Sequence, residues 1–229
     1  MATFDLIFCG GNNQRLGSIA IREGFKYGCR LPNDKPFFPV YFADQNWKQP
    51  NKKEYMAALA KHRPSIATVL DWETLSQLDE VMSWAEEMAG YVDRVIVIPK
   101  VVNETHRIPL TIGGKSIVLG YSVPTRHGAT PVPFWEFEGR DVHLLGGSPQ
   151  RQMSETDYLA CIANVVSVDG NMMLKMATSK CLHWTRDKSA FGHWQPAQRG
   201  ENGVEEAFAL SCRNISSAWD EYWRQKGVE

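Results

Sequence analysis

Seven short apolar runs along the chain constrain its fold more than any other feature. They are Phe4–Cys9, Phe38–Ala43, Ser65–Leu70, Arg94–Ile98, Ser116–Gly120, Asp141–Leu145 and Asn164–Val168. Several of these runs are nearly continuous in Val, Ile, Leu and Phe. Such runs indicate strands that are buried on both faces, as in a parallel sheet.

Helix-like stretches lie between and after these runs. Apolar residues recur at helical spacing in Asn51–His62, Thr74–Ala89, Ser154–Ala163 with Ser154 as its N-cap, and Gly203–Gln225. Alternating strands and helices predict an α/β fold, either a doubly wound sheet or a (β/α)-barrel. We favour a TIM-barrel-like (β/α)-barrel with a C-terminal helical and aromatic segment. A barrel needs eight strands, so it is incomplete unless the sequence disguises one.

The chain reads as a single domain, residues 1–229, to which the C-terminal segment 171–229 belongs. Its 229 residues suffice for one large domain, and with 43% hydrophobic residues it can bury a substantial core. No internal repeat, low-complexity tract or linker divides it.

Composition limits the location and the partners of the protein. The formal net charge of −1 excludes a polycation that coats nucleic acid but allows a local basic groove. The five scattered cysteines indicate reduced thiols and a cytoplasmic protein, and they form no zinc-binding cluster. No apolar run approaches the roughly 20 residues that a membrane helix needs. The N-terminus also lacks the apolar region of a signal peptide.

Three strand-like runs are followed by an aspartate. In parallel α/β folds, ligands bind beyond the carboxyl ends of the strands. Asp44, Asp71 and Asp169 would therefore share one barrel mouth, beside the paired glycines Gly146 and Gly147. Asp and Gly are also ordinary turn residues. Carboxylates that share a mouth repel one another unless a metal or a hydrogen-bonding ligand separates them, so both a Mg²⁺-type site and a purine site are open.

The order and spacing of these segments resemble the tRNA-guanine transglycosylase superfamily. The resemblance lies in Tyr41–Asp44, Lys53–Arg63, Ser65–Glu73, His143–Ser148 and Val165–Asp169, and it covers roughly Phe4 to Lys180. The chain is most similar to the DNA-directed members of phages and bacterial genomic islands. Those members exchange guanine in DNA for a 7-deazaguanine, in the host cytoplasm when they are phage-encoded.

The chain departs from the superfamily pattern at three places. Asp44-Gln45-Asn46-Trp47 stands where the family has Asp-Ser-Gly-Gly-Phe-Gln, and Gly120-Tyr121-Ser122 stands where it has a glutamine-bearing strand end. The zinc-binding cysteine motif of the tRNA enzymes is absent, which favours DNA over tRNA as the substrate.

The resemblance implies a role for each site residue. Asp169 would be the nucleophile, which forms a covalent aspartyl intermediate, and Asp44 an acid/base or a base-recognition group. The substrate-binding residues would be Asp71, Gly146, Gly147, Ser148 and Tyr121. The two glycines would direct backbone N–H groups to the base carbonyl. The family needs no metal or cofactor for this exchange.

The segment after Asp169 combines bases with aromatic residues. Lys175, Lys180, Arg186 and Lys188 would contact phosphates of the nucleic acid. The alternative is a packed aromatic subdomain with a solvated rim.

Two other functions remain open at the level of sequence. One is a metal-dependent barrel hydrolase, in which Asp44, Asp71 and Asp169 are oxygen ligands. The other is a DNA-binding protein without catalysis. The oligomeric state is not predicted.

Overall fold

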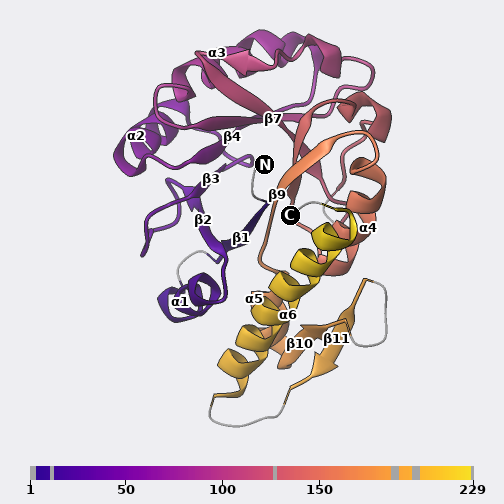
Figure 1. Ribbon diagram of the computed structural model, residues 1–229. Coiled ribbons are helices and arrows are strands. Elements are labelled where there is room, and N and C mark those ends of the chain that lie inside the picture. Colours follow the sequence, from indigo (N-terminus) through magenta and orange to yellow (C-terminus); the bar gives the residue numbers. More distant parts are fainter. Residues whose placement is uncertain (1–3, 11–12, 126–127, 187–190, 198–201, 228–229) are drawn as a thin grey trace.

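Eight parallel strands close into a barrel, which confirms the predicted fold class (Figure 1). The computed structural model describes residues 4–10, 13–125, 128–186, 191–197 and 202–227, and the strand count refers to these residues. The barrel strands are β1 (Asp5–Cys9), β2 (Lys26–Leu31), β3 (Phe42–Gln45), β4 (Ile66–Trp72), β5 (Arg94–Pro99), β7 (Lys115–Ser122), β8 (Asp141–Leu145) and β9 (Asn164–Gly170). They follow one another around the barrel in chain order. Pairing of β5 with β7 and of β1 with β9 closes the ring.

Strand β2 is the eighth strand, which the search for apolar runs missed. Its sequence Lys-Tyr-Gly-Cys-Arg-Leu alternates and contains two bases and a glycine. Gly28 faces the barrel interior, where a Cβ would lie 2.8 Å from the Cys9 sulfur and 2.9 Å from Ile7. The residues that face outward, Tyr27, Cys29 and Leu31, are buried in the outer core. Close packing inside the barrel therefore removes the apolar side chain that would have marked this strand.

Helices cover only some of the connections between strands. They are α1 (Gln14–Arg22), α2 (Lys52–His62), α3 (Leu78–Met88), α4 (Pro149–Leu159), α5 (Met172–Lys180) and α6 (Gly203–Gln225). The connection from β5 to β7 holds a 3₁₀ turn, η2 (Thr105–Arg107), and a short strand, β6 (Thr111–Ile112), and that from β7 to β8 holds the turn η3 (Phe134–Phe137). Residues 32–41 join β2 to β3 without a helix.

The predicted helix boundaries hold at two places and fail at two. Asn51 caps α2, and α6 spans the predicted residues. The stretch from Thr74 begins as a 3₁₀ turn, η1 (Leu75–Gln77), before α3. Ser154 is not an N-cap, because Ser148 caps α4 and Pro149 occupies the first helical position, where a missing N–H costs nothing.

Apolar side chains form two layers that the barrel wall separates. The inner layer consists of Ile7, Phe42, Ile66, Ile96, Ile98, Val118 and Val166. The larger outer layer lies between the strands and the covering helices. Because side chains alternate along a strand, the inner layer leaves inward positions free at both ends of the barrel for polar residues.

The N-terminal end of the barrel is closed by a polar cluster of Asp5, Tyr41 and Arg94. Arg94 donates to Asp5 at 3.1 Å and to the Tyr41 hydroxyl at 2.9 Å, and that hydroxyl donates to Asp5. Burial, followed by the hydrogen bond to Asp5, raises the pKa of Tyr41 to about 12. Each member of this cluster is thus bonded to the other two.

The C-terminal segment packs as one unit against the barrel. In Figure 1, α5 and the hairpin of β10 (Leu182–Thr185) and β11 (His193–Pro196) lie below the barrel in orange, and the yellow α6 runs from beside them up to α4. Trp184 is fully buried, and its backbone N–H donates to Ser211 of α6 at 2.9 Å. Trp219 of α6 packs on Phe4 with ring centres 4.7 Å apart. None of the described helices is both long and apolar enough to cross a membrane.

Candidate functional site

A cavity of about 520 Å³ opens at the C-terminal ends of the barrel strands. The three predicted aspartates, Asp44, Asp71 and Asp169, all line it, together with Gly146 and Gly147. They come from β3, β4, β9 and the turn after β8, which are far apart in the sequence. The structure therefore brings together five of the seven residues that were predicted to catalyse the reaction or bind substrate.

Asp44 is the carboxyl group with the most unusual environment in this cavity. Its side chain points inward from β3, and its Oδ1 accepts a hydrogen bond of 3.1 Å from the Thr68 hydroxyl. Burial, followed by the negative charge of Asp169, raises the pKa of Asp44 to about 7. Thr68 opposes this shift without cancelling it. At neutral pH, Asp44 can therefore both donate and accept a proton.

Asp169 lies inside β9, one residue before the strand ends. Its Oδ1 accepts a hydrogen bond of 3.0 Å from the Gly146 N–H and lies 3.3 Å from Nε2 of His143. The Cys9 thiol is also close, and burial, followed by the charge of Asp169, raises the pKa of that thiol well above its ordinary value. Asp169 is thus surrounded by hydrogen-bond donors, and only 13% of its side chain is exposed.

His143 is a site residue to which the sequence analysis gave no role. It is fully buried beneath the cavity, where its Nδ1 lies 2.7 Å from the Ser167 hydroxyl. The ring of Phe42 packs against its imidazole at 5.1 Å between ring centres. His143 precedes the inward-facing Leu145 by two residues, so strand alternation could have pointed to it.

The Gly146–Gly147 turn lines the cavity. Both residues have positive φ, 66° and 83°, and a Cβ on Gly147 would lie 2.5 Å from Val123. The predicted role of the Gly146 N–H is corrected, because it donates to Asp169 and is not free for a base carbonyl. Gln152, which the sequence analysis missed, ties the turn to β9. Its amide donates to the carbonyls of Gly146 at 2.8 Å and Asp169 at 2.7 Å.

Asp71 shares its side of the cavity with Lys100, which the sequence analysis also missed. The Lys100 ammonium donates to the Ser122 hydroxyl at 2.6 Å and lies 4.0 Å from Asp71 Oδ2. Burial raises the pKa of Asp71 and lowers that of Lys100, and each charge opposes the shift of the other. Lys100 directly follows β5, a position that ordinary turn residues also occupy, so the sequence alone did not distinguish it as a site residue.

Two predicted substrate-binding residues do not line the cavity. Tyr121 faces outward from β7, donates to Glu155 of α4 at 2.9 Å, and stacks on Phe134. The strand pleat explains the difference, since Gly120 and Ser122 take the inward positions on either side of it. Ser148 caps α4 by accepting from the Arg151 N–H.

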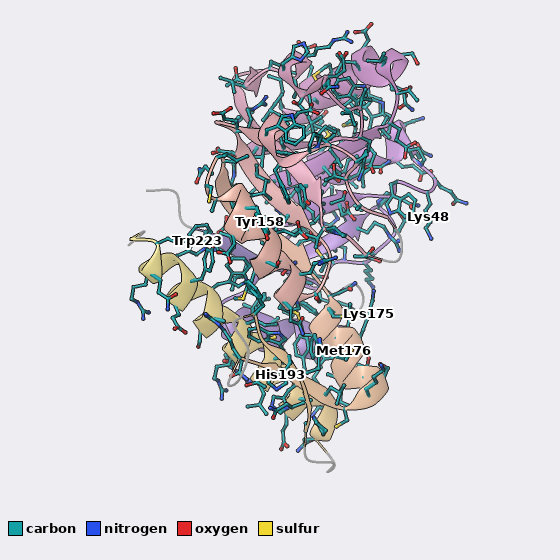
Figure 2. The ribbon with its side chains drawn as sticks, turned by 90° about the vertical axis from the view of Figure 1, so that its right-hand side faces the viewer. Lys48, Tyr158, Lys175, Met176, His193 and Trp223 are labelled. Atoms are coloured by element: carbon teal, nitrogen blue, oxygen red, sulfur yellow. The ribbon has the colours of Figure 1, made fainter. Side chains whose placement is uncertain are left out.

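The predicted phosphate contacts have three different outcomes. Lys175 and Lys180 are exposed on α5, directly after β9. Arg186 lies against α6, where its guanidinium contacts Glu221 at 3.5 Å. Lys188 lies outside the described residues. Figure 2 shows Lys175 on the same side of the molecule as Lys48, which follows the cavity-lining Trp47.

The two tryptophans of the C-terminal hairpin pack against the core. Trp184 is fully buried, and Trp194 is half-buried opposite it in the hairpin. The most exposed aromatic residue at the cavity is instead Trp47, of which 57% is exposed.

The carboxylates do not form a recognisable metal site. Within the part of the chain that the structure describes, no group of three or more His, Cys, Asp or Glu side chains is arranged to hold a metal ion. Lys100 lies 4.0 Å from Asp71, and Asp169 Oδ1 contacts His143 and the Gly146 N–H, so the groups nearest to both carboxylates are nitrogen donors.

The sequence profile of a family of unknown function, DUF6610, matches residues 20–220. This range includes every site residue described above except Cys9. No curated protein matches the chain.

Proposed function

The chain belongs to the DUF6610 family of unknown function, and we propose that it is a glycosyltransferase that exchanges guanine in DNA for a 7-deazaguanine. One observation carries the proposal. Two carboxyl groups with different environments, Asp169 among donors and Asp44 with a pKa of about 7, face one cavity. Glycosyl transfer with a covalent intermediate needs such a pair, because one group attacks while the other moves a proton.

In the first step, a carboxylate oxygen of Asp169 attacks C1′ of a deoxyguanosine. The C1′–N9 bond breaks, its electron pair leaves with the guanine, and the proton held by Asp44 neutralises the departing base. In the second step, the 7-deazaguanine loses its N9 proton to Asp44 and attacks C1′. The ester bond to Asp169 then breaks, and both carboxyl groups return to their starting state.

The dimensions of the site suit this substrate. A cavity of about 520 Å³ is within the range of sites that enclose small molecules, so it can hold a nucleobase with its sugar. The target nucleotide must leave the DNA stack to reach Asp169. Trp47 at the cavity and the exposed Lys175 on α5 offer a ring and a charge for the flanking strand.

The alternatives from the sequence have less support. A metal-dependent hydrolase would need several ligands grouped around one ion, and no such group of His, Cys, Asp or Glu occurs among the residues that the structure describes. A DNA-binding protein without catalysis leaves the raised pKa of Asp44 unexplained, since burying such a group costs stability.

Mass spectrometry of nucleosides tests the proposal. Cells that express the protein and are supplied with a 7-deazaguanine base should contain 7-deazaguanine deoxynucleoside in their DNA. Cells that express Asp169→Asn at the same level should contain none. A modified nucleoside in tRNA but not in DNA would refute DNA as the substrate, and none in either would refute the proposed exchange.

A further inference from the structure

Asp71 and Lys100 form a polar pair whose hydrogen-bonding capacity is largely unused. Lys100 has three N–H donors, of which Ser122 takes one at 2.6 Å. Asp71 lies 4.0 Å away, beyond hydrogen-bond range, and its carboxylate has no hydrogen bond to another described residue. Only 25% of the Asp71 side chain and 17% of the Lys100 side chain are exposed, and both line the cavity. The Lys100 ammonium and the Asp71 carboxylate therefore offer an unused donor and an unused acceptor side by side in a half-buried site.

Backbone pairing and Ser122 position Lys100 beside Asp71. The Lys100 N–H donates to the Trp72 carbonyl at 2.9 Å, which continues the pairing of β5 with β4 past the strand end. The Ser122 hydroxyl then holds the Lys100 ammonium from β7, on its other side. The pair is therefore built on three neighbouring strands, β4, β5 and β7, and Ser122 positions the Lys100 ammonium.

Two other ion pairs show what this spacing means. At the opposite end of the barrel, Asp5 and Arg94 approach to 3.1 Å and Tyr41 fills the remaining hydrogen bonds. Lys115 and Asp93 are 3.9 Å apart, but 74% of the Asp93 side chain is exposed, so water can complete their hydrogen bonds. The Asp71–Lys100 distance is as long as that of the Lys115–Asp93 pair, whereas its two side chains are nearly as buried as those of Asp5 and Arg94. A ligand that supplies both an acceptor and a donor would complete it.

We propose that Lys100 is a specificity-determining residue that, together with Asp71, reads the lactam edge of a guanine-type base. Lys100 donates to the O6 atom, a contact that lysine makes to guanine elsewhere, and Asp71 accepts from N1–H and the 2-amino group. Adenine presents a donor at position 6 and an acceptor at N1, so both contacts would become repulsive. Guanine and 7-deazaguanines share the lactam edge, which lets one pocket accept the leaving and the entering base. This inference rests on the proposed function.

Calorimetric binding of free bases to the purified protein tests this inference without any exchange reaction. Guanine and 6-thioguanine are the probes, because they differ only in the atom at position 6. Wild-type protein should bind guanine about 10-fold more tightly than 6-thioguanine, since sulfur is a weak acceptor for the ammonium. Lys100→Met should weaken guanine binding by about 10-fold to 100-fold and bring the ratio of the two affinities close to 1.

Two further variants serve as controls for the loss of a positive charge and for misfolding. Lys115→Met removes a lysine from an ion pair of the same length at the other end of the barrel and should leave both affinities unchanged. Ser122→Ala leaves the charge but frees the ammonium, so it should lower the preference for guanine by a smaller factor. If Lys100→Met does not fold, as judged by circular dichroism, the comparison rests on Ser122→Ala.

Each outcome decides the inference. A loss of the guanine preference in Lys100→Met, with an unchanged Lys115→Met, supports it. An unchanged preference in Lys100→Met, or in Ser122→Ala where that variant carries the test, overturns the role of Lys100 and leaves the proposed exchange standing. If the wild-type protein binds neither guanine nor 6-thioguanine, both the role of Lys100 and the proposed exchange are overturned.

Discussion

The two ends of the barrel place charged residues at similar inward positions but use them differently. At the N-terminal end, Asp5, Tyr41 and Arg94 hydrogen-bond to one another. At the C-terminal end, three aspartates face one lysine around about 520 Å³ of open space. One end has matched charges and the other has an excess of negative charge.

This difference indicates which end is built for stability and which for chemistry. A buried polar cluster whose members are all satisfied rigidifies a fold. A cluster with repelling carboxyl groups and unused donors destabilises the free protein and is expected where a ligand completes it. Substitutions at the N-terminal end should therefore mainly lower stability, whereas substitutions at the C-terminal end should mainly lower activity. The following predictions test that contrast.

The largest effect is expected from Asp169→Asn. The amide cannot form the glycosyl ester, so the rate of base exchange should fall by about three orders of magnitude or more, while the protein stays folded and still binds DNA. The measurement is incorporation of labelled guanine into DNA, with binding followed by fluorescence anisotropy. A near-normal rate in this variant would remove Asp169 from the mechanism.

Asp44→Asn should lower the exchange rate by about 10²-fold to 10⁴-fold, which is typical for the loss of a general acid. In the wild type, the rate should fall above pH 7, because the Asp44 carboxyl, with a pKa of about 7, then loses the proton that it donates. The variant should lack this alkaline limb. An unchanged limb in Asp44→Asn would assign the ionisation to another group.

The same carboxyl group makes a prediction about stability. Its pKa is about 7 in the folded protein and has an ordinary value of 3.8, so the folded state binds the extra proton between these values. The free energy of unfolding should therefore decrease as the pH rises through that window. Asp44→Asn should weaken this decrease. Urea unfolding of both proteins at pH 5 and pH 8 measures the difference.

At the other end of the barrel, Asp5→Asn should cost about 3 kcal/mol of stability, because it leaves the Arg94 charge without its partner. The exchange rate of the folded fraction should stay within about twofold of the wild type, since Asp5 is separated from the cavity by the inner apolar layer. Asp93→Ala breaks the exposed pair with Lys115 and should cost at most about 1 kcal/mol. Equal losses in the two variants would show that the Asp5 cluster does not stabilise the barrel.

The smallest effect is expected from Tyr121→Phe. This change removes the buried hydrogen bond to Glu155 and should cost about 1 kcal/mol of stability. Exchange and base binding should be unaffected, because Tyr121 faces away from the cavity. A loss of base binding in a variant with normal stability would restore Tyr121 to the site.

Much of the fold could be predicted from the sequence because seven barrel strands lie in or overlap predominantly apolar runs. Strand β2 was missed, since close packing against Cys9, Ile7 and Phe42 requires glycine at its inward position 28. The end of β3 was misplaced because Asp44 and Gln45 are polar yet lie within the strand. Apolar patterning thus fails where the barrel is tightest and where it becomes polar.

The candidate site was predicted in part. Asp44, Asp71 and Asp169 could be found because carboxylates at the ends of parallel strands converge. Lys100 and His143 were missed because their importance depends on partners from other strands. Lys100 lies beside Asp71 and Ser122. His143 contacts Ser167 and Asp169. Tyr121 was misassigned, since a shift of one residue along a strand turns a side chain from the cavity to the outer core.

The central claim is that Asp169 becomes covalently bonded to C1′ of a nucleotide. Wild-type protein incubated with guanine-containing DNA, without an incoming base, and then denatured in acid should retain DNA on the chain. Peptide mass spectrometry should locate the adduct at Asp169, and Asp169→Asn should carry none. An adduct on another residue, or rapid exchange by a wild-type protein that never retains DNA, would contradict the account.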